Sequence, residues 1–336
     1  MEKLLSIVVP IYKVEPYINK CLDSLLLYVT NDKGERVLDE QRMGLMDILL
    51  INDGTPDNSA VMAREYVKLY PQYFRQIDKE NGGHGSVWNM GILEAKGKYI
   101  RFLDSDDWLE HLDFLLDKLQ KTDTDLVLTN TLDYCPNGEF WLERVHGFIP
   151  ELEYDIDTYD WKHHKGSLNC FLHHSCTFKR EILLPYVPLF LEKQPYDDSV
   201  LPMALICVAK TLVEYDFVCY QYLLDRPGQT MSKEVRIKHL AAQIKANQQI
   251  ILFIENNIKK DESPKALFLM RRVRKMYQNW YKPDFNLSYD DNKHRTALWN
   301  EWVRTQNGRP LTPLMLLYYC LPYRLYYGLC KRLMKR

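Results

Sequence analysis

Hydrophobic and amphipathic segments alternate along the first hundred residues of the chain, and this alternation restricts the fold more than any other feature. Four short runs rich in Val, Ile, Leu and Phe predict buried strands, and segments with apolar residues at helical spacing predict the helices between them. Such alternation favours a parallel sheet with helices on both faces, so we expect an α/β fold. The predicted strands are residues 4–9, 47–51, 74–78 and 98–103, and the predicted helices are residues 17–27, 59–70 and 86–95.

Beyond residue 110 the pattern changes twice. Residues 111–232 mix strands with helices, whereas the chain from residue 234 onward has helical periodicity. We therefore predict one α/β domain over 1–232, with halves 1–110 and 111–232, and a mainly helical extension over 233–336. Elements expected here are strands at 125–129 and 211–215 and helices at 199–209, 237–258 and 265–280.

The segment 31–42 is rich in charge and lies where a short connection is usual, so we expect an exposed insertion. Over the 336 residues, 44 basic side chains face 45 acidic ones, and this balance gives no support for a nucleic-acid partner. The composition is that of a globular protein, with 46% hydrophobic and 26% charged residues.

Eight cysteines are scattered without a C-x-x-C pair, and the first residues do not have the pattern of a secretory signal. We therefore expect a cytoplasmic protein with reduced thiols, and no zinc site built on paired cysteines. The histidine pairs at 163–164 and 173–174 lie close to Cys170 and Cys176, which leaves a metal site there open.

Polar side chains follow the end of each of the four predicted strands. Residues 12–15 follow the first strand, Asp53 the second, residues 79–84 the third and residues 104–107 the fourth. The carboxyl ends of parallel strands meet at one edge of the sheet, where ligands bind in such folds. The sequence therefore predicts a binding site at this edge.

Asp104, Ser105 and Asp106 form a D-x-D motif at the end of the fourth strand. Residues i and i+2 of a strand point the same way, so the two carboxylates are expected to converge. Oxygen ligands of this kind suit a hard divalent cation that also binds substrate phosphates. The alternative is that Asp106 or Asp107 caps the element that follows.

Asp53 precedes Gly54, and an Asp at this position often stabilises a turn without any ligand. The same carboxylate is also able to accept hydrogen bonds from a nucleobase ring or a ribose hydroxyl. Both interpretations remain open on this residue alone.

Five short motifs occur in one order along the first 110 residues. They are SIVVPIYKVE at 6–15, INDG at 51–54, ENGGHG at 80–85, WNMG at 88–91 and RFLDSDD at 101–107. The series resembles the bacterial family 2 glycosyltransferases, which have a GT-A fold, a Rossmann-like and mostly parallel sheet flanked by helices, and which invert the anomeric carbon. The resemblance is close over the first 110 residues and looser to residue 232.

The resemblance implies a role for each matching position. Residues after the first strand surround the nucleoside, Asp53 holds the base, and the loop after the third strand lines the donor pocket. Asp104 lies near the ribose and the metal, and Asp106 binds Mn²⁺ or Mg²⁺, which neutralises charge on the departing diphosphate. The implied nucleotide-sugar contacts are Pro10, Tyr12, Glu15, Asp53, Lys79, Asn81, Gly83 and Asp104.

Two further positions come from the second half of the α/β domain. Asp197 and Asp198 resemble the family's Glu-Asp motif at a helix start, and this makes Asp198 the implied catalytic base. The alternative is an N-cap for the helix at 199–209. Arg226 lies in a segment that resembles the family's loop over the diphosphate, so it is an expected phosphate contact.

Four residues depart from the family pattern. Lys13 stands where relatives often have Asn, Trp88 replaces a common Arg, and Asp197 replaces Glu. His84 lies in the glycine loop where relatives often have a small or apolar residue. We include His84 among the donor contacts, with simple exposure as the alternative. These departures leave the metal site intact and put the sugar preference in doubt.

Residues 311–336 combine leucines and tyrosines with a basic end, a composition suited to a helix in a membrane interface. The alternative is a core-packing helix with a solvated tail. No apolar run reaches the length of a membrane-spanning helix. We therefore expect a cytoplasmic protein with peripheral contact at the inner face of the membrane.

The sequence thus predicts an inverting glycosyltransferase that moves a sugar from a nucleotide-diphosphate donor, expected to be a UDP-sugar, to a hydroxyl of a glycan or lipid-linked acceptor. A non-catalytic sugar-nucleotide-binding scaffold for other glycosyltransferases is the alternative. A nucleotidyltransferase is disfavoured, because Pro10, Ile11 and Tyr12 occupy the place of its Gly-rich, basic loop.

Overall fold

The computed structural model describes residues 2–135, 139–143, 148–164, 172–195, 197–224, 239–258, 262–284, 286–306 and 312–333. The chain separates into two compact units, Met1–Gln229 and Thr230–Arg336, and each is described by itself.

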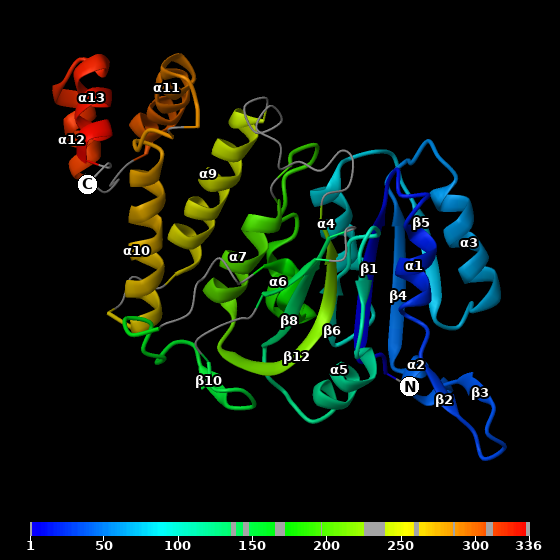
Figure 1. Cartoon of the computed structure of the whole chain (residues 1–336). Coiled ribbons are helices and arrows are strands. Elements are labelled where there is room, and N and C mark those ends of the chain that lie inside the picture. Colours follow the sequence, from blue (N-terminus) through cyan, green and yellow to red (C-terminus); the bar gives the residue numbers. More distant parts are fainter. Residues whose placement is uncertain are drawn as a thin grey trace. The chain divides into compact units, whose positions relative to one another are not determined.

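The four strands predicted in the first 110 residues form the parallel part of the main sheet (Figure 1). β1 pairs in parallel with both β4 and β6, and β5 pairs in parallel with β4 on the other side. This confirms the predicted α/β class and brings the four strand ends to one edge. The strands are β1 (Leu5–Ile11), β4 (Met46–Asn52), β5 (Phe74–Asp78) and β6 (Tyr99–Phe102).

The second half of this unit extends the sheet in mixed directions, in the order β10-β12-β8-β11-β6-β1-β4-β5. β11 is antiparallel to both β6 and β8, whereas β12 is parallel to β8. β7 pairs with β12 and β9 pairs with β8. These strands are β7 (Trp108–Leu109), β8 (Leu126–Tyr134), β9 (Phe140–Glu143), β10 (Glu153–Asp155), β11 (Cys176–Lys179) and β12 (Thr211–Leu223).

β12 is much longer than the strand predicted at 211–215. Its register against β8 shifts between Tyr215 and Val218, where the polar Asp216 interrupts the hydrophobic run that the prediction followed. Beyond the shift the strand resumes and carries Tyr220 to the carboxyl edge, where it reaches Asp104.

Helices cover both faces of the parallel strands, as the alternation predicts. Leu5, Ile7 and Val9 of β1 belong to a buried cluster with α1 and α5 on one face. Successive strand residues point to opposite faces, so Val8 faces the other side, where Gly91 of α4 lies so close that an added Cβ would be 2.6 Å from the valine side chain. The helices of this unit are α1 (Ile18–Asp23), α3 (Ser59–Leu69), α4 (His84–Glu94), α5 (Leu112–Leu119), α6 (Arg180–Leu183) and α7 (Val200–Val208).

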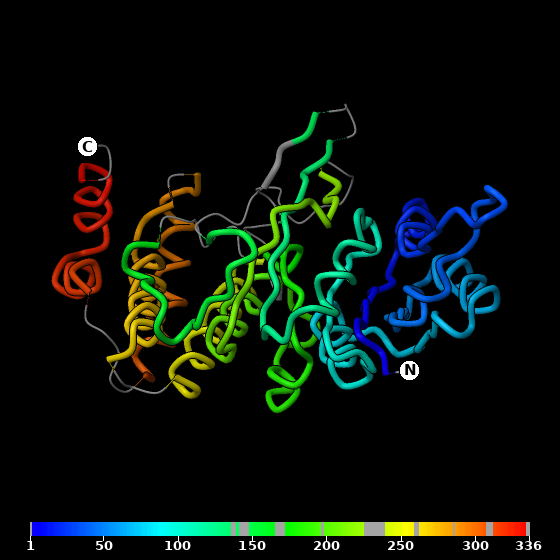
Figure 2. The backbone as a smooth tube through the Cα atoms, turned by 90° about the horizontal axis from the view of Figure 1, so that it is seen from below, coloured from blue at the N-terminus to red at the C-terminus, as the bar shows by residue number. Residues whose placement is uncertain are grey.

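The predicted insertion at 31–42 is exposed, but it is more ordered than a loop. β2 (Tyr28–Thr30) and β3 (Arg36–Leu38) pair as an antiparallel hairpin, and α2 (Glu40–Gly44) follows. Asn31 forms the turn, because its Oδ1 accepts hydrogen bonds from the backbone N–H groups of Lys33 and Glu35. Figures 1 and 2 both show the hairpin standing clear of the main sheet.

The C-terminal unit is helical throughout its described residues, in agreement with the predicted extension. Its interior is strongly aromatic: Trp299 is fully buried between Trp280 and Trp302, and Tyr326 is buried as well. Within the described segments, no helix has the length and apolarity needed to cross a membrane. The helices are α9 (Leu240–Asn257), α10 (Pro264–Asn279), α11 (Tyr289–Thr305), α12 (Pro313–Cys320) and α13 (Tyr323–Leu333).

Candidate active site at the carboxyl ends of the parallel strands

Asp53, at the end of β4, organises the loop that follows β5. Its Oδ1 accepts hydrogen bonds from Lys79 Nζ at 2.6 Å and from the Gly82 N–H at 2.8 Å, and its Oδ2 accepts one from the Gly83 N–H at 2.8 Å. The side-chain amide of Asn81 donates to the backbone carbonyl of Asp53. The two predicted donor-pocket segments therefore form one structure around a buried carboxylate.

The turn expected from an Asp before Gly is made by the neighbouring residue instead. Asn52 Oδ1 accepts a hydrogen bond from the Thr55 N–H, while the Asp53 carboxylate faces the loop. A carboxylate oxygen accepts about two hydrogen bonds, so Oδ1 of Asp53 is saturated and Oδ2 retains one free direction. That remaining direction is what a base N–H would use.

Asp104, at the end of β6, lies among three histidines. Its Oδ1 is 3.2 Å from His84 Nε2, and its Oδ2 is 3.2 Å from His173 Nε2 and 3.9 Å from His174 Nε2. His84 comes from the start of α4, and the other two come from the short 3₁₀ turn His173–Ser175 before β11. Three separate segments thus converge on one carboxylate.

The electrostatics of this cluster favour an ionised aspartate beside a neutral histidine. Burial alone would raise the pKa of Asp104, but the charge of His173 and the hydrogen bonds from His173 and His84 hold it well below its usual value. Burial, reinforced by the charge of His173, lowers the pKa of His174 well below that of a free imidazole. His174 therefore keeps a nitrogen lone pair available at neutral pH.

Asp106 and Asp107 are both buried beside Asp104. Burial and the charges of Asp106 and Asp104 raise the pKa of Asp107, which accepts hydrogen bonds from the Tyr220 hydroxyl at 2.7 Å and the Leu223 N–H at 2.8 Å. Neither residue caps a helix, because the next element is the strand β7. The capping alternative for this motif is therefore wrong.

Two buried side chains fix the histidine turn in place. Arg101 of β6 donates to the backbone carbonyl of His174 and to the hydroxyl of Thr177. Trp88 of α4 stacks on Phe102 with ring centroids 4.4 Å apart, and it contacts both His84 and His173 at its edges. Trp88, which departs from the family pattern, thus supports the histidines instead of forming a salt link.

Sequence reasoning singled out His173 and His174 only as partners for nearby cysteines, and the structure pairs them with Asp104 instead. The other histidine pair lies elsewhere: His163 Nδ1 is 2.6 Å from Asp160, and His164 packs in an aromatic group around Phe148. Cys176 is buried and donates to the Leu172 carbonyl, and burial raises its pKa to about 12. No signal within the chain's linear order indicated that the turn would meet the D-x-D motif.

Asn89 explains how the segment before Asp198 is held. Its Oδ1 accepts hydrogen bonds from the Leu189 and Phe190 N–H groups, and its Nδ2 donates to the Phe190 carbonyl. Three residues further on, the Lys193 N–H donates to the Gly82 carbonyl of the donor loop at 2.6 Å. The chain then enters α7 within a few residues, so Asp198 follows a segment that is tied to the predicted donor pocket.

Asp198 is exposed in the 3₁₀ turn Asp197–Ser199. The N-cap residue of α7 is Ser199, and no side chain there makes a capping hydrogen bond, so the capping alternative for Asp198 is not realised. Arg226, the expected phosphate contact, lies outside the described residues.

The segment after β1 lines the same edge. Tyr12 is 43% exposed, and Lys13 adopts a positive φ of 56° with its Nζ 5.2 Å from the Tyr12 ring centroid. Glu15 accepts hydrogen bonds from the backbone and side chain of Asn58, at the start of α3. Pro10 is the last but one residue of β1. An exposed aromatic ring at this edge presents a face for a base, whereas Glu15 fixes the neighbouring turn.

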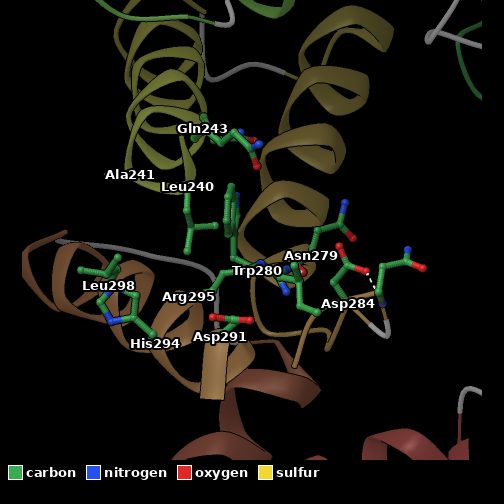
Figure 3. Close-up of a pocket in the computed structure, with 13 residues that line it drawn as sticks. Leu240, Ala241, Gln243, Asn279, Trp280, Asp284, Asp291, His294, Arg295 and Leu298 are labelled. Carbon is green, nitrogen blue, oxygen red and sulfur yellow. Dashed lines mark hydrogen bonds between the residues drawn. The ribbon is translucent and has the colours of Figure 1, made fainter. Parts of the chain in front are cut away.

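A separate cavity of about 430 Å³ lies within the C-terminal unit, where side chains of α9, α10 and α11 and of the α10–α11 connection converge (Figure 3). Arg295 donates to the carbonyls of Lys282 and Asn279 and lies 5.0 Å from the Trp280 ring centroid. Arg295 therefore anchors the connection after α10. The lining residues are Leu240, Ala241, Gln243, Asn247, Asn279, Trp280, Asp284, Asn286, Leu287, Asp291, His294, Arg295 and Leu298.

The sheet order and the polar edge define a protein with the GT-A fold. A solved structure with this architecture, that of S. aureus TarS in complex with UDP-GlcNAc, is 16% identical, with a TM-score of 0.54 over 91% of this chain and 93% of that one. The chain belongs to glycosyl transferase family 2, because the model of that family matches residues 6–184.

Curated relatives match the N-terminal part of the chain. The uncharacterized glycosyltransferase EpsJ of Bacillus subtilis (strain 168) is 39% identical over 129 residues, which cover 38% of this chain and 33% of EpsJ. The minor teichoic acid biosynthesis protein GgaB of the same organism is 36% identical over 104 residues, or 30% of this chain and 10% of GgaB. The chain thus spans a third or less of the length of these relatives.

Proposed function

We propose that this protein is an inverting glycosyltransferase that moves a sugar from a nucleotide-diphosphate donor, a UDP-sugar, to a hydroxyl of a glycan or lipid-linked acceptor. The observation that carries the proposal is the carboxyl edge of the sheet. There the loop around Asp53 and the cluster around Asp104 lie at the ends of strands that flank β1 on either side.

The donor half of the site has two parts with different chemistry. Tyr12 and the free direction of Asp53 Oδ2 suit a nucleobase, which needs a flat face and an acceptor for its ring N–H. The backbone N–H groups of the Gly82–Gly83 loop are already used by Asp53. The diphosphate charge is therefore left to the other part, at the D-x-D motif.

The residues at the D-x-D motif fit a divalent cation. Asp104 carries a carboxylate whose pKa is held low, Asp106 is buried beside it, and His173 and His174 bring nitrogen atoms within reach. When bound, Mn²⁺ or Mg²⁺ would neutralise charge that develops on the leaving diphosphate. Asp104 and Asp106 are the proposed metal residues.

Asp198 is the proposed catalytic base. An exposed carboxylate is able to accept the proton of an acceptor hydroxyl as its oxygen attacks the anomeric carbon opposite the departing diphosphate. The backbone tie between Lys193 and Gly82 supports this role, because it holds the preceding segment against the donor loop.

A donor screen tests the proposal. Purified protein is incubated with Mn²⁺ and a panel of sugar nucleotides, and release of the free nucleotide diphosphate is followed with and without EDTA. We expect metal-dependent release from one UDP-sugar. No release and no calorimetric binding with any sugar nucleotide would contradict the proposal and favour the scaffold alternative.

We also propose that the C-terminal helices contact an anionic membrane surface. Most tyrosines of this segment pack against one another, for example Tyr318 against Tyr326, which agrees in part with the core-packing alternative. Leu316, Leu325 and Leu333 nevertheless stay exposed. The exposed cations on α13 are Arg324, Lys331 and Arg332.

Vesicle binding tests this second proposal. Each basic residue near an anionic surface contributes about 1 kcal/mol, so replacing Arg324, Lys331 and Arg332 together by Gln should weaken binding to phosphatidylserine vesicles by about 100-fold. Neutral phosphatidylcholine vesicles serve as the control. Equal binding of both proteins to anionic vesicles would contradict the proposal.

A further inference from the structure

The cluster at Asp104 has the composition of a transition-metal site. One ligand atom each from Asp104, His173 and His174 lies within 4.8 Å of the others, and Asp106 is not a member of this group. Asp104 Oδ2 is 3.2 Å from His173 Nε2 and 3.9 Å from His174 Nε2. Two ligands bound at about 2.1 Å from one ion lie about 3 Å apart, so the observed spacings are close to those of a coordinated set.

Hydrogen bonding alone leaves this arrangement incomplete. The side chains of His173 and His174 are 5% and 7% exposed, and the Nδ1 atom of each has no hydrogen-bond partner among the described residues. The two rings also lie with centroids only 3.8 Å apart. Two protonated imidazoles at this distance would repel each other strongly, so at least one nitrogen faces the carboxylate without a proton to share.

The surroundings hold the two histidines in this position. Arg101 binds the His174 carbonyl, Trp88 contacts the edge of His173, and the Tyr222 ring lies 4.5 Å from that of His174. Because the rings are fixed before any ion arrives, binding needs little reorganisation.

The donor set decides which ion such a site prefers. Mg²⁺ takes oxygen ligands almost entirely and retains several waters, whereas imidazole nitrogen suits Mn²⁺, Co²⁺, Ni²⁺ and Zn²⁺ better. Two imidazoles and one carboxylate are therefore a set for a first-row transition ion.

We propose that Asp104, His173 and His174 form the protein's divalent-cation site and that the two histidines select a transition ion over Mg²⁺. This deepens the proposed function, since it names ligands and an ion for the same site. It also assigns the histidine turn a role that neither the D-x-D motif nor the family pattern contains. Asp106 then acts on the cation or the phosphate from beside this set.

Metal titration of the full-length protein without any sugar nucleotide tests the proposal. Co²⁺ should bind with one ion per chain and give the visible d–d absorption of a nitrogen-ligated site, and Mn²⁺ should compete for it. Mg²⁺ at 100-fold excess should leave the Co²⁺ spectrum in place. Displacement by Mg²⁺ at equal concentration would overturn the selectivity.

Matched variants identify the ligands. His173→Gln and His174→Gln should each weaken Co²⁺ binding by about 10- to 100-fold or more, since even partners outside the ligand set alter affinity by that much. His163→Gln, in the separate histidine pair, should bind like the parent. Thermal unfolding without metal shows whether each variant is folded. Unchanged Co²⁺ affinity in both folded ligand variants would overturn the proposal.

This result is independent of the proposed transfer reaction, because it is measured on the metal alone. A chain that binds Co²⁺ through both histidines but releases no nucleotide would keep the metal site and contradict the transferase. A chain that transfers sugar equally well with Mg²⁺, and binds Co²⁺ without the histidines, would do the reverse.

Discussion

The two ends of the parallel strands carry similar polar residues but differ in how far these residues are satisfied by the protein itself. At the amino ends, Asp47 accepts hydrogen bonds from Ser6, from the Arg75 guanidinium and from the Lys96 N–H. The Ser6 hydroxyl in turn accepts from the Gly97 N–H at 2.8 Å. This end is a closed network that leaves no room for a ligand.

At the carboxyl ends, the cluster around Asp104 includes buried nitrogen atoms that have no partner among the described residues: Nδ1 of His173, Nδ1 of His174 and Nε1 of Trp88. Unsatisfied buried polar groups are uncommon and call for an explanation. The comparison teaches that a charged cluster is a candidate site when its own groups leave hydrogen-bonding capacity unused. The same residue types are structural when nothing is left over.

The largest expected effect concerns the carboxyl end. Asp106→Ala should reduce turnover at least about 100-fold, because a bound cation contributes several kcal/mol to transition-state stabilisation and each 1.4 kcal/mol is tenfold in rate. Initial rates with the donor found in the screen measure this. Activity like that of the parent would remove Asp106 from the metal site.

Asp198→Asn separates chemistry from binding at the same end. Loss of a general base should lower kcat by about 10²- to 10⁴-fold, while the donor dissociation constant stays within about twofold. Parallel kinetics and calorimetry give both numbers. A large loss of donor affinity would place Asp198 in the binding pocket instead.

The matching change at the amino end should affect stability and not chemistry. Asp47→Ala leaves the Arg75 guanidinium and the Lys96 N–H without their acceptor, and we expect the free energy of unfolding to fall by about 2–4 kcal/mol. Urea unfolding measures the loss, and kcat of the folded fraction should stay near that of the parent. An equal loss of kcat would contradict the division between the two ends.

The smallest effect is a pH dependence at the amino end. Burial would raise the pKa of Asp47, but hydrogen bonds from Arg75, Ser6 and the Lys96 N–H lower it below its ordinary value. The stabilising contribution is therefore complete above about pH 4, the ordinary carboxyl pKa, and is lost as the pH falls through the lowered folded value. Urea midpoints between pH 7 and pH 3 should fall more steeply for the parent than for Asp47→Asn; parallel curves would contradict this assignment.

Much of the parallel sheet could be predicted because its signals are local. The strand at 74–78 matches β5, and the strand at 47–51 lies within β4, because each is a short hydrophobic run closed by polar residues. The strand at 211–215 was predicted too short, since a bulge near Asp216 breaks the run without ending the strand. The hairpin at β2 and β3 was missed because its few residues are exposed and carry no apolar alternation.

The candidate site divides in the same way. The positions of Asp53 and Asp104 at strand ends follow from the chain's order, and the family resemblance supplies their expected roles. The meeting of Asp104 with His173 does not, because 69 residues separate them and the contact depends on β11 inserting antiparallel beside β6. Pairings of this kind are set by the sheet's topology and not by any local pattern.

One measurement tests the central claim that the carboxyl edge binds a nucleotide diphosphate through a cation. Calorimetric titration of UDP into the full chain, with Mn²⁺ and then with EDTA, should show binding that EDTA removes. It should be weakened about 100-fold in Asp104→Asn and left unchanged in Asp47→Asn. UDP binding that is indifferent to EDTA and to Asp104 would contradict the account.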